Sequence, residues 1–188
     1  MSFDTPIPTY SASDPHATFL NSSCLDFLLI ELVPLAQRLA NELSVHGELD
    51  EEEEREAVFY RLEMLGYRVG LGLAERFSRD RARMVETLDV IKFCCKDLWT
   101  IVFRKQIDNL KTNHRGVYVL TDNTFRPFAR MSTEAGGAAV IRAQPFLWFP
   151  CGVIRGALAA LGVNASVQAE TTELPSAIFK IETVNKGL

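Results

Sequence analysis

The chain has 188 residues, 47% of them hydrophobic, with a formal net charge of −4. This length is enough for a single domain with a substantial core, and the acidic balance excludes a basic surface for nucleic acid. The sequence contains no run of about 20 uncharged apolar residues, so it predicts no membrane-spanning helix. The four cysteines have no CxxC spacing. This favours free, buried thiols in a reducing compartment, so we expect a cytoplasmic protein.

The N-terminal segment, residues 1–16, contains three prolines and no apolar run. We expect a disordered leader rather than a signal peptide. One domain is then predicted over residues 17–188.

Helices dominate the first part of this domain. A first helix is predicted over about residues 17–43, with Pro34 inside it. The acidic run 48–56 leads into a second helix at about 54–77, whose N-terminus favours carboxylates. Apolar residues at helical spacing predict a third helix over about 84–111.

Glycines at 66, 70 and 72 raise the possibility of a phosphate-binding loop. However, a helical pattern precedes them in place of a strand, and no GK[ST] sequence follows, so nucleotide-binding motifs are excluded. Small residues spaced four apart instead predict a smooth helix surface for close packing. The second helix has Gly66, Gly70 and Ala74 in this pattern, and a later helix has Gly152, Gly156 and Ala160.

Alternating patterns predict strands at 116–122, 163–170 and 176–183, and a fourth helix is predicted at about 146–161. Residues 129–144 are expected to be a connection. Helices first and paired strands later indicate an α+β fold, with a layer of about four helices on one face of a small antiparallel sheet.

The second helix has more apolar surface than one core requires. Its first stripe, predicted to face the core, is Val58, Leu62, Leu65, Val69 and Leu73. A second stripe on another face comprises Tyr60, Met64, Tyr67 and Leu71. Such a surplus favours a protein partner. We therefore predict a partner interface made of this second stripe with Leu29 and Val33 of the first helix.

Residues for catalysis or metal binding are not brought together by any pattern. His16, His46 and His114 are scattered, and no nucleophile–base arrangement is present. We expect no enzyme activity, no metal and no cofactor. Arg155 lies in an apolar helix, where an ion pair with a carboxylate such as Glu75 or Asp97 is expected.

Several stretches resemble a known family. "EMLGYRVGLGLAER", "FCCKDLW", "DNLKTNHRGVYVLTDNTF" and "CGVIRGALAALG" look like the small subunits of the transport protein particle (TRAPP), a vesicle-tethering complex. The similarity is to the subunit-six type of the BET-three-like family and covers about residues 17–184. It implies the same helix-on-sheet fold.

The resemblance also implies a role. It implies a non-enzymatic scaffold that forms a heterodimer with a paralogous subunit through the first two helices and joins other TRAPP subunits. A homodimer is an alternative for the isolated chain. The complex acts as a nucleotide exchange factor for a Rab-type GTPase, and the chain is expected to associate peripherally with ER and Golgi membranes through it.

Related subunits hold an acyl chain on a cysteine between the second and third helices. The corresponding connection here, Arg76 to Leu88, contains no cysteine. We therefore expect no covalent acylation. An alternative function stays open: a lipid or hydrophobic-ligand binding module with a glycine-lined helical cavity.

Overall fold

The computed structural model describes residues 20–44, 50–113, 115–131 and 138–184. The leader expected at residues 1–16 and all three histidines lie outside these ranges. In chain order the described elements are α1 (Ser22–Ser44), α2 (Glu51–Ser78), α3 (Thr87–Phe93), the π-helical segment η1 (Cys94–Leu98), α4 (Trp99–Phe103), β1 (Asn109–Thr112), β2 (Val117–Asp122), the 3-10 helix η2 (Arg126–Arg130), α5 (Ala138–Ala143), the 3-10 helix η3 (Gln144–Leu147), α6 (Trp148–Ala160), β3 (Ala165–Glu170) and β4 (Ala177–Thr183).

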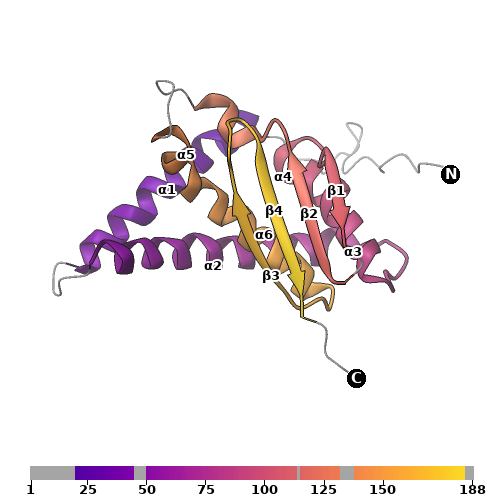
Figure 1. Ribbon diagram of the computed structural model, residues 1–188. Coiled ribbons are helices and arrows are strands. Elements are labelled where there is room, and N and C mark those ends of the chain that lie inside the picture. The colour runs from indigo at the N-terminus through magenta and orange to yellow at the C-terminus, as the bar shows by residue number, and fades with distance from the viewer. Residues whose placement is uncertain (1–19, 45–49, 114, 132–137, 185–188) are drawn as a thin grey trace.

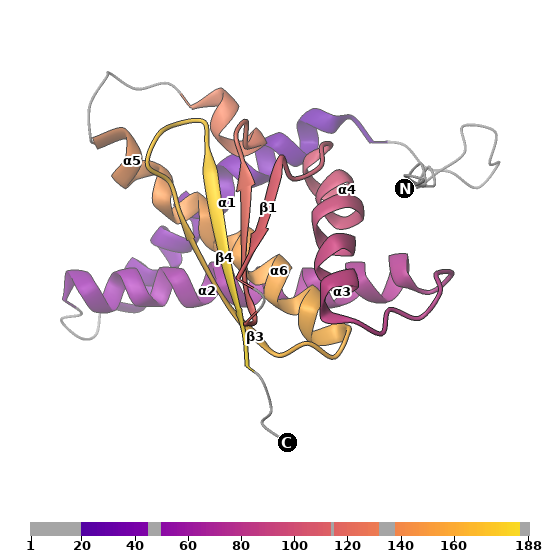
Figure 2. The same ribbon diagram turned by 45° about the vertical axis from the view of Figure 1, so that its right-hand side comes forward.

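The strands form one antiparallel sheet in the order β1-β2-β4-β3. Leu120 of β2 lies opposite Phe179 of β4, and both side chains are fully buried. Lys180 and Glu182 alternate with the buried residues of β4 and face solvent. One sheet face is therefore covered. Figure 1 shows the sheet in front with α6 and α2 behind it, and Figure 2 shows α3 and α4 to the right of β1. The α+β architecture predicted from the sequence is confirmed.

The core between sheet and helices is aromatic. Trp99 of α4 packs against Phe103, Phe125 and Phe179, with ring centroids 4.4 to 6.1 Å apart. All four residues are 2% exposed or less. A second, smaller cluster joins α1 to the first half of α2 and includes Val33, Ala36 and Leu62. The α1–α2 pair therefore has a core of its own beside the main one.

The acidic segment begins α2 through a complete capping box. Asp50 accepts hydrogen bonds from the backbone N–H groups of Glu52 and Glu53, at 3.0 and 2.8 Å. The Glu53 carboxylate in turn accepts from the Asp50 N–H. This arrangement satisfies donors that a helix N-terminus leaves free. The helix consequently begins three residues earlier than predicted.

Two predicted boundaries are wrong. The third helix was predicted to continue to about residue 111, but it ends at Phe103 because Arg104 adopts a left-handed conformation with φ 63°. Residues 109–112 form β1 instead, where pairing with β2 outweighs their helical propensity. The predicted connection 129–144 also contains η2 up to Arg130 and the short helix α5.

The face that α2 buries also differs from the predicted stripe. Its most buried line is Val58, Leu62, Gly66, Gly70 and Ala74. Val69, predicted to face the core, is 37% exposed. The physical reason is that glycines bring α6 closest to α2, so the small residues rather than the large ones occupy the centre of the contact.

Candidate partner interface

The strip of small residues on α2 (Gly66, Gly70 and Ala74) faces the strip on α6 (Gly152, Gly156 and Ala160) across the α2–α6 contact. A β-carbon added at Gly70 would lie 2.9 Å from the backbone nitrogen of Ala157, and one at Gly66 would lie 3.0 Å from that of Val153. From the other side, a β-carbon at Gly152 would lie 2.7 Å from the backbone nitrogen of Tyr67. These separations are below normal contact distance, so only glycine allows the two backbones to approach this closely.

The remaining members of the strips behave differently. Gly156 lies against the backbone of Tyr67, and Ala74 is fully buried. Ala160 is exposed at the end of α6, so its predicted close-packing role is wrong. Gly72, by contrast, has no atom within 4 Å of an added β-carbon.

Arg155 forms the ion pair expected of it, but with a different partner. Its guanidinium donates to the carboxylate of Glu63, with an Nη2–Oε2 distance of 2.7 Å, and stacks on the Tyr67 ring at 4.3 Å. The hydrogen bond to Glu63 raises the pKa of Arg155. Asp97, one predicted partner, instead binds Arg81. The pair ties α6 to α2 beside the glycine contact.

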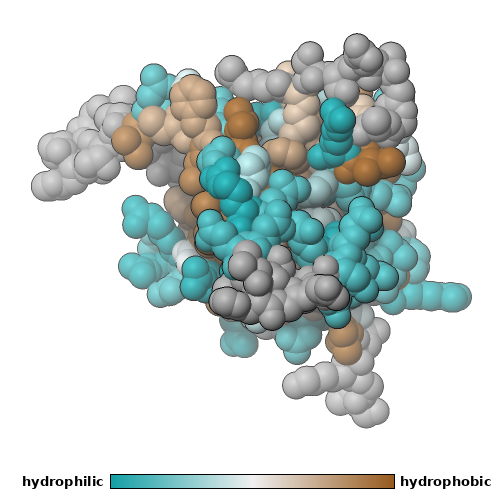
Figure 3. Space-filling model, turned by 90° about the vertical axis from the view of Figure 1, so that its left-hand side faces the viewer, coloured by the Kyte–Doolittle hydropathy of each residue, from teal (hydrophilic) through white to brown (hydrophobic). Residues whose placement is uncertain are grey.

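Large apolar side chains remain exposed on α1 and α2. On α1, Phe27 is 69% exposed, and on α2, Tyr60 is 65% exposed. The further exposed apolar residues on α1 are Leu28, Ile30, Leu35 and Leu39, each at 40% or more. Figure 3 views the end of the molecule where α1 turns into α2, and it shows apolar side chains gathered along the left-hand side with hydrophilic ones over the centre.

The predicted interface residues are not equally accessible. Val33 is 5% exposed and belongs to the core between α1 and α2, so it cannot face a partner and its assignment is wrong. Leu29 packs against the same cluster and is half-buried. Met64, Tyr67 and Leu71 are half-buried as well. Met64 and Tyr67 contact Arg155, which places this stripe on the side of α2 next to α6.

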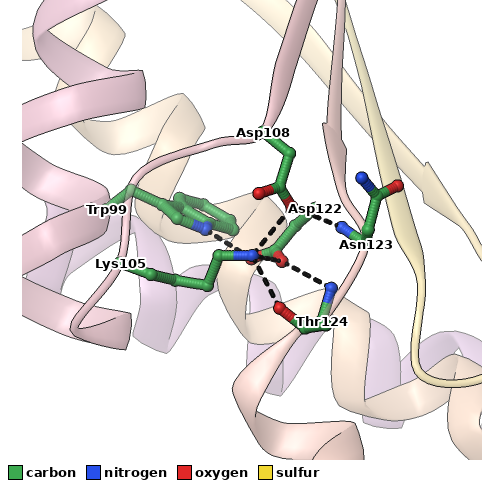
Figure 4. Close-up of polar contacts among 6 residues, drawn as sticks. All are labelled: Trp99, Lys105, Asp108, Asp122, Asn123 and Thr124. Atoms are coloured by element: carbon green, nitrogen blue, oxygen red, sulfur yellow. Dashed lines mark hydrogen bonds and ion pairs between the residues drawn. The ribbon is translucent and has the colours of Figure 1, made fainter.

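A polar cluster closes the end of β2 (Figure 4). Asp122 is fully buried and accepts from Trp99 Nε1 at 2.8 Å and from Lys105 Nζ at 2.5 Å. The Lys105 ammonium also donates to Asp108 and Thr124. The ammonium group of Lys105 has three N–H donors, and the hydrogen bonds to Asp108, Asp122 and Thr124 occupy all three. The arrangement is therefore a structural junction rather than a reactive site.

The charges in this cluster stabilise each other. Burial lowers the pKa of Lys105, but its hydrogen bonds to Asp108 and Asp122 outweigh that effect and leave the pKa raised. Burial likewise raises the pKa of Asp108, but hydrogen bonds from Lys105 and the Asn123 backbone leave it lowered. Sequence reasoning missed this cluster because its members are separated along the chain. In the sequence, only the neighbouring polar residues Asp122 and Asn123 at the end of a predicted strand pointed to this place.

Three of the four cysteines are buried thiols of low reactivity. Cys94, Cys95 and Cys151 are buried, and burial raises the pKa of Cys95 to about 12. Burial raises the pKa of Cys94 and Cys151 as well. Cys24 on α1 is exposed, contrary to the expectation of buried thiols. Among the described residues no group of three metal-ligating side chains is found, and no described helix is long and apolar enough to cross a membrane.

Comparisons with known proteins agree with the resemblance in the sequence. Residues 25–185 match the family described as transport protein particle (TRAPP) component. Human trafficking protein particle complex subunit 6B is 51% identical over 64% of this chain and 75% of its own length. An uncharacterized protein of Schizosaccharomyces pombe is 43% identical over 87% of this chain, although the match spans only 64% of that relative.

A solved structure shares the fold. The crystal structure of a trafficking protein particle complex subunit 3 from Naegleria fowleri, covalently bound to palmitic acid, superposes with a TM-score of 0.66. The match covers 88% of this chain and 98% of that one, at 14% identity. The chain therefore belongs to the TRAPP component family, and the similarity to subunit 6B confirms the subunit-six type.

Proposed function

We propose that this chain is a scaffold subunit of a TRAPP vesicle-tethering complex, which it enters by pairing with a paralogous subunit through α1 and α2. The observation that carries the proposal is the exposed apolar surface on these helices. Leu28, Leu35 and Leu39 are 58%, 42% and 40% exposed on one side of α1. Large apolar side chains gathered on a helix pair indicate a surface that a protein partner covers.

The role follows from the family. Subunits of this type support a complex that acts as an exchange factor for a Rab-type GTPase, and the chain's contribution is structural rather than catalytic. Its association with ER and Golgi membranes is peripheral and passes through the complex. The polar groups of the described residues support this view, because the buried carboxylates of Glu63 and Asp122 are both paired.

The alternative, a hydrophobic-ligand binding module, receives less support. The glycines that would line its cavity are occupied by the backbone of the facing helix. The two hollows beside α1, which are partly open to solvent, have volumes of only about 20 and 10 Å³, far too small for an acyl chain. A groove of about 670 Å³ beside Ser78, Met84 and Leu161 is open at the surface.

The proposal is tested by co-expression with a TRAPP subunit 3-type chain from the same organism. We expect the wild-type chain to co-purify with it as a stoichiometric pair. The double variant Leu28→Asp/Leu35→Asp should lose the partner while its circular dichroism stays unchanged. Val85→Asp provides the matched control, because Val85 is 84% exposed in the α2–α3 connection. Association of the double variant at wild-type strength would contradict the proposal.

A further inference from the structure

The C-terminal end of α2 borders a groove that the proposed pairing does not use. The groove measures about 670 Å³ and lies where the α2–α3 connection passes the end of α6, between Ser78 and Leu161. At 1.5 Å per residue, Ser78 lies about 30 Å along α2 from Val58, which packs against α1. Figure 1 shows α2 running from α1 on the left toward α3 on the right. The groove therefore lies apart from the core that joins α1 to α2.

Two arginines make this groove basic. Arg81 is held in place, because Asp97 accepts hydrogen bonds from both of its Nη atoms and its guanidinium lies 5.2 Å from the centre of the Phe93 ring. Arg83 is exposed, and among the described residues no carboxylate pairs with it. No acidic residue is found in the described lining of the groove. Residues 79–85 hold three arginines and one aspartate, a local net charge of +2 in a chain whose total is −4.

Apolar side chains line the groove beside the arginines. Val85 is 84% exposed, whereas Met84 and Leu161 are half-buried because they pack against the main core. A single exposed valine on a protein surface would need no explanation. Here the valine adjoins two further apolar side chains in a recess. The groove thus offers an apolar contact and an unpaired guanidinium group side by side.

This combination fits an extended acidic segment better than other occupants. The planar guanidinium group of Arg83 matches a carboxylate, with which it can form two parallel hydrogen bonds. An acyl chain would satisfy the apolar residues but would leave Arg83 against a group that accepts no hydrogen bond. The plane of a membrane cannot enter a recess, whereas a peptide segment can.

We propose that this groove, the Arg83 groove, binds a linear segment of a partner protein in which acidic residues lie next to aliphatic ones. A carboxylate of the segment pairs with Arg83, and an aliphatic side chain packs on Met84 and Val85. Arg81 stays with Asp97 and adds positive charge beside the segment. The inference goes beyond the proposed function, because the chain can hold this second protein while a paired subunit occupies α1.

A selection that does not presuppose the partner tests the proposal. The purified full chain selects from a phage-displayed library of random dodecapeptides, and we expect the enriched peptides to combine aspartate or glutamate with leucine, isoleucine or valine. A fluorescein-labelled copy of the most enriched peptide is then titrated with the chain at low and high salt. Arg83→Gln and Val85→Asp should each weaken binding by roughly tenfold, and Arg83→Gln should also reduce its salt dependence. Arg142→Gln, at an exposed arginine of α5 outside the groove, is the matched control and should bind normally.

The outcomes separate this inference from the proposed function. Leu28→Asp/Leu35→Asp should keep peptide binding, and Val85→Asp should keep pairing with the subunit 3-type chain, so either proposal can fail alone. If no acidic and aliphatic motif is enriched, or if Arg83→Gln and Val85→Asp bind the peptide as wild type does, the inference is overturned. Sedimentation with vesicles of phosphatidylcholine and phosphatidylserine in equal parts that depends on Arg83, without peptide binding, would overturn it in favour of a membrane contact.

Discussion

At the scale of single residues, the glycines of α2 divide into two kinds that sequence spacing does not distinguish. Gly66 and Gly70 meet the backbone of α6, whereas an added β-carbon at Gly72 would meet nothing within 4 Å. The four-residue spacing of small residues in α2 and α6 correctly predicted smooth helix surfaces. It could not reveal that the two strips pack on each other, because periodicity defines a face of a helix but not what lies opposite.

The first prediction concerns these glycines. We expect Gly70→Ala and Gly156→Ala each to destabilise the chain by about 1–3 kcal/mol, since the new methyl group would force two backbones apart. Gly72→Ala should instead stabilise the isolated chain by up to about 1 kcal/mol through helix propensity. Thermal melts of the three variants provide the measurement. A higher melting temperature for Gly70→Ala and Gly156→Ala would show that these contacts are not tight.

The second prediction concerns the polar cluster in Figure 4. Lys105→Met leaves the fully buried Asp122 without its charged donor, so we expect a loss of about 1.5–3 kcal/mol in chemical denaturation. Lys92→Met is the matched control, because the ion pair of Lys92 with Asp89 is half exposed and its removal should have little effect. Equal stability of the two variants would contradict a structural role for Lys105.

The same cluster gives a pH dependence with a definite sign. The pKa of Asp108 is lowered in the folded state, so its contribution to stability is present above its ordinary pKa near 3.8 and is lost as the pH falls below that value. The raised pKa of Lys105 contributes below 10.5 and is lost at more alkaline pH. In Asp108→Asn we expect the acid-side loss of stability to become shallower.

At the scale of elements, periodicity predicted the long helices and the paired strands but not where the third helix ends. Residues 104–111 retain helix-compatible spacing, and only tertiary pairing with β2 makes Asn109–Thr112 a strand. The π-helical segment η1 gave no signal in the sequence either. It leaves the Cys95 carbonyl free to accept a hydrogen bond from the Ile107 N–H, at 3.0 Å, which ties the chain after α4 back to the helix.

The α2–α3 connection carries the third prediction, which is that the chain has no thioester-linked lipid. The connection between Arg76 and Leu88 contains no cysteine, and the buried Cys94, Cys95 and Cys151 have raised pKa values that keep them protonated and weakly nucleophilic. Intact mass spectrometry of protein from its own cell should show no hydroxylamine-sensitive acyl group. Such a mass on Cys94 or Cys95 would contradict the prediction directly.

At the scale of the whole molecule, the surplus of apolar surface was visible in the sequence, but its arrangement was not. The sequence predicted a partner surface made of the α2 stripe that begins at Tyr60, together with Leu29 and Val33 of the first helix. In the structure Tyr60 of α2 is 65% exposed, whereas the exposed leucines Leu28, Leu35 and Leu39 belong to α1. A single partner that covers both of these flanks, the α1 leucines and the Tyr60 side of α2, would make them parts of one interface.

The last prediction tests whether the two flanks act together. If one partner covers α2, Tyr60→Ala should weaken its binding by about 1–2 kcal/mol, because exposed tyrosines often contribute strongly at interfaces. Met64→Asp/Leu71→Asp, on the same flank, should block association while the isolated domain stays helical by circular dichroism. Aspartate at these half-buried positions can also disturb packing against Arg155, so Tyr60→Ala is the cleaner variant. Binding of Tyr60→Ala at wild-type strength, with loss of binding in Leu28→Asp/Leu35→Asp, would confine the interface to α1.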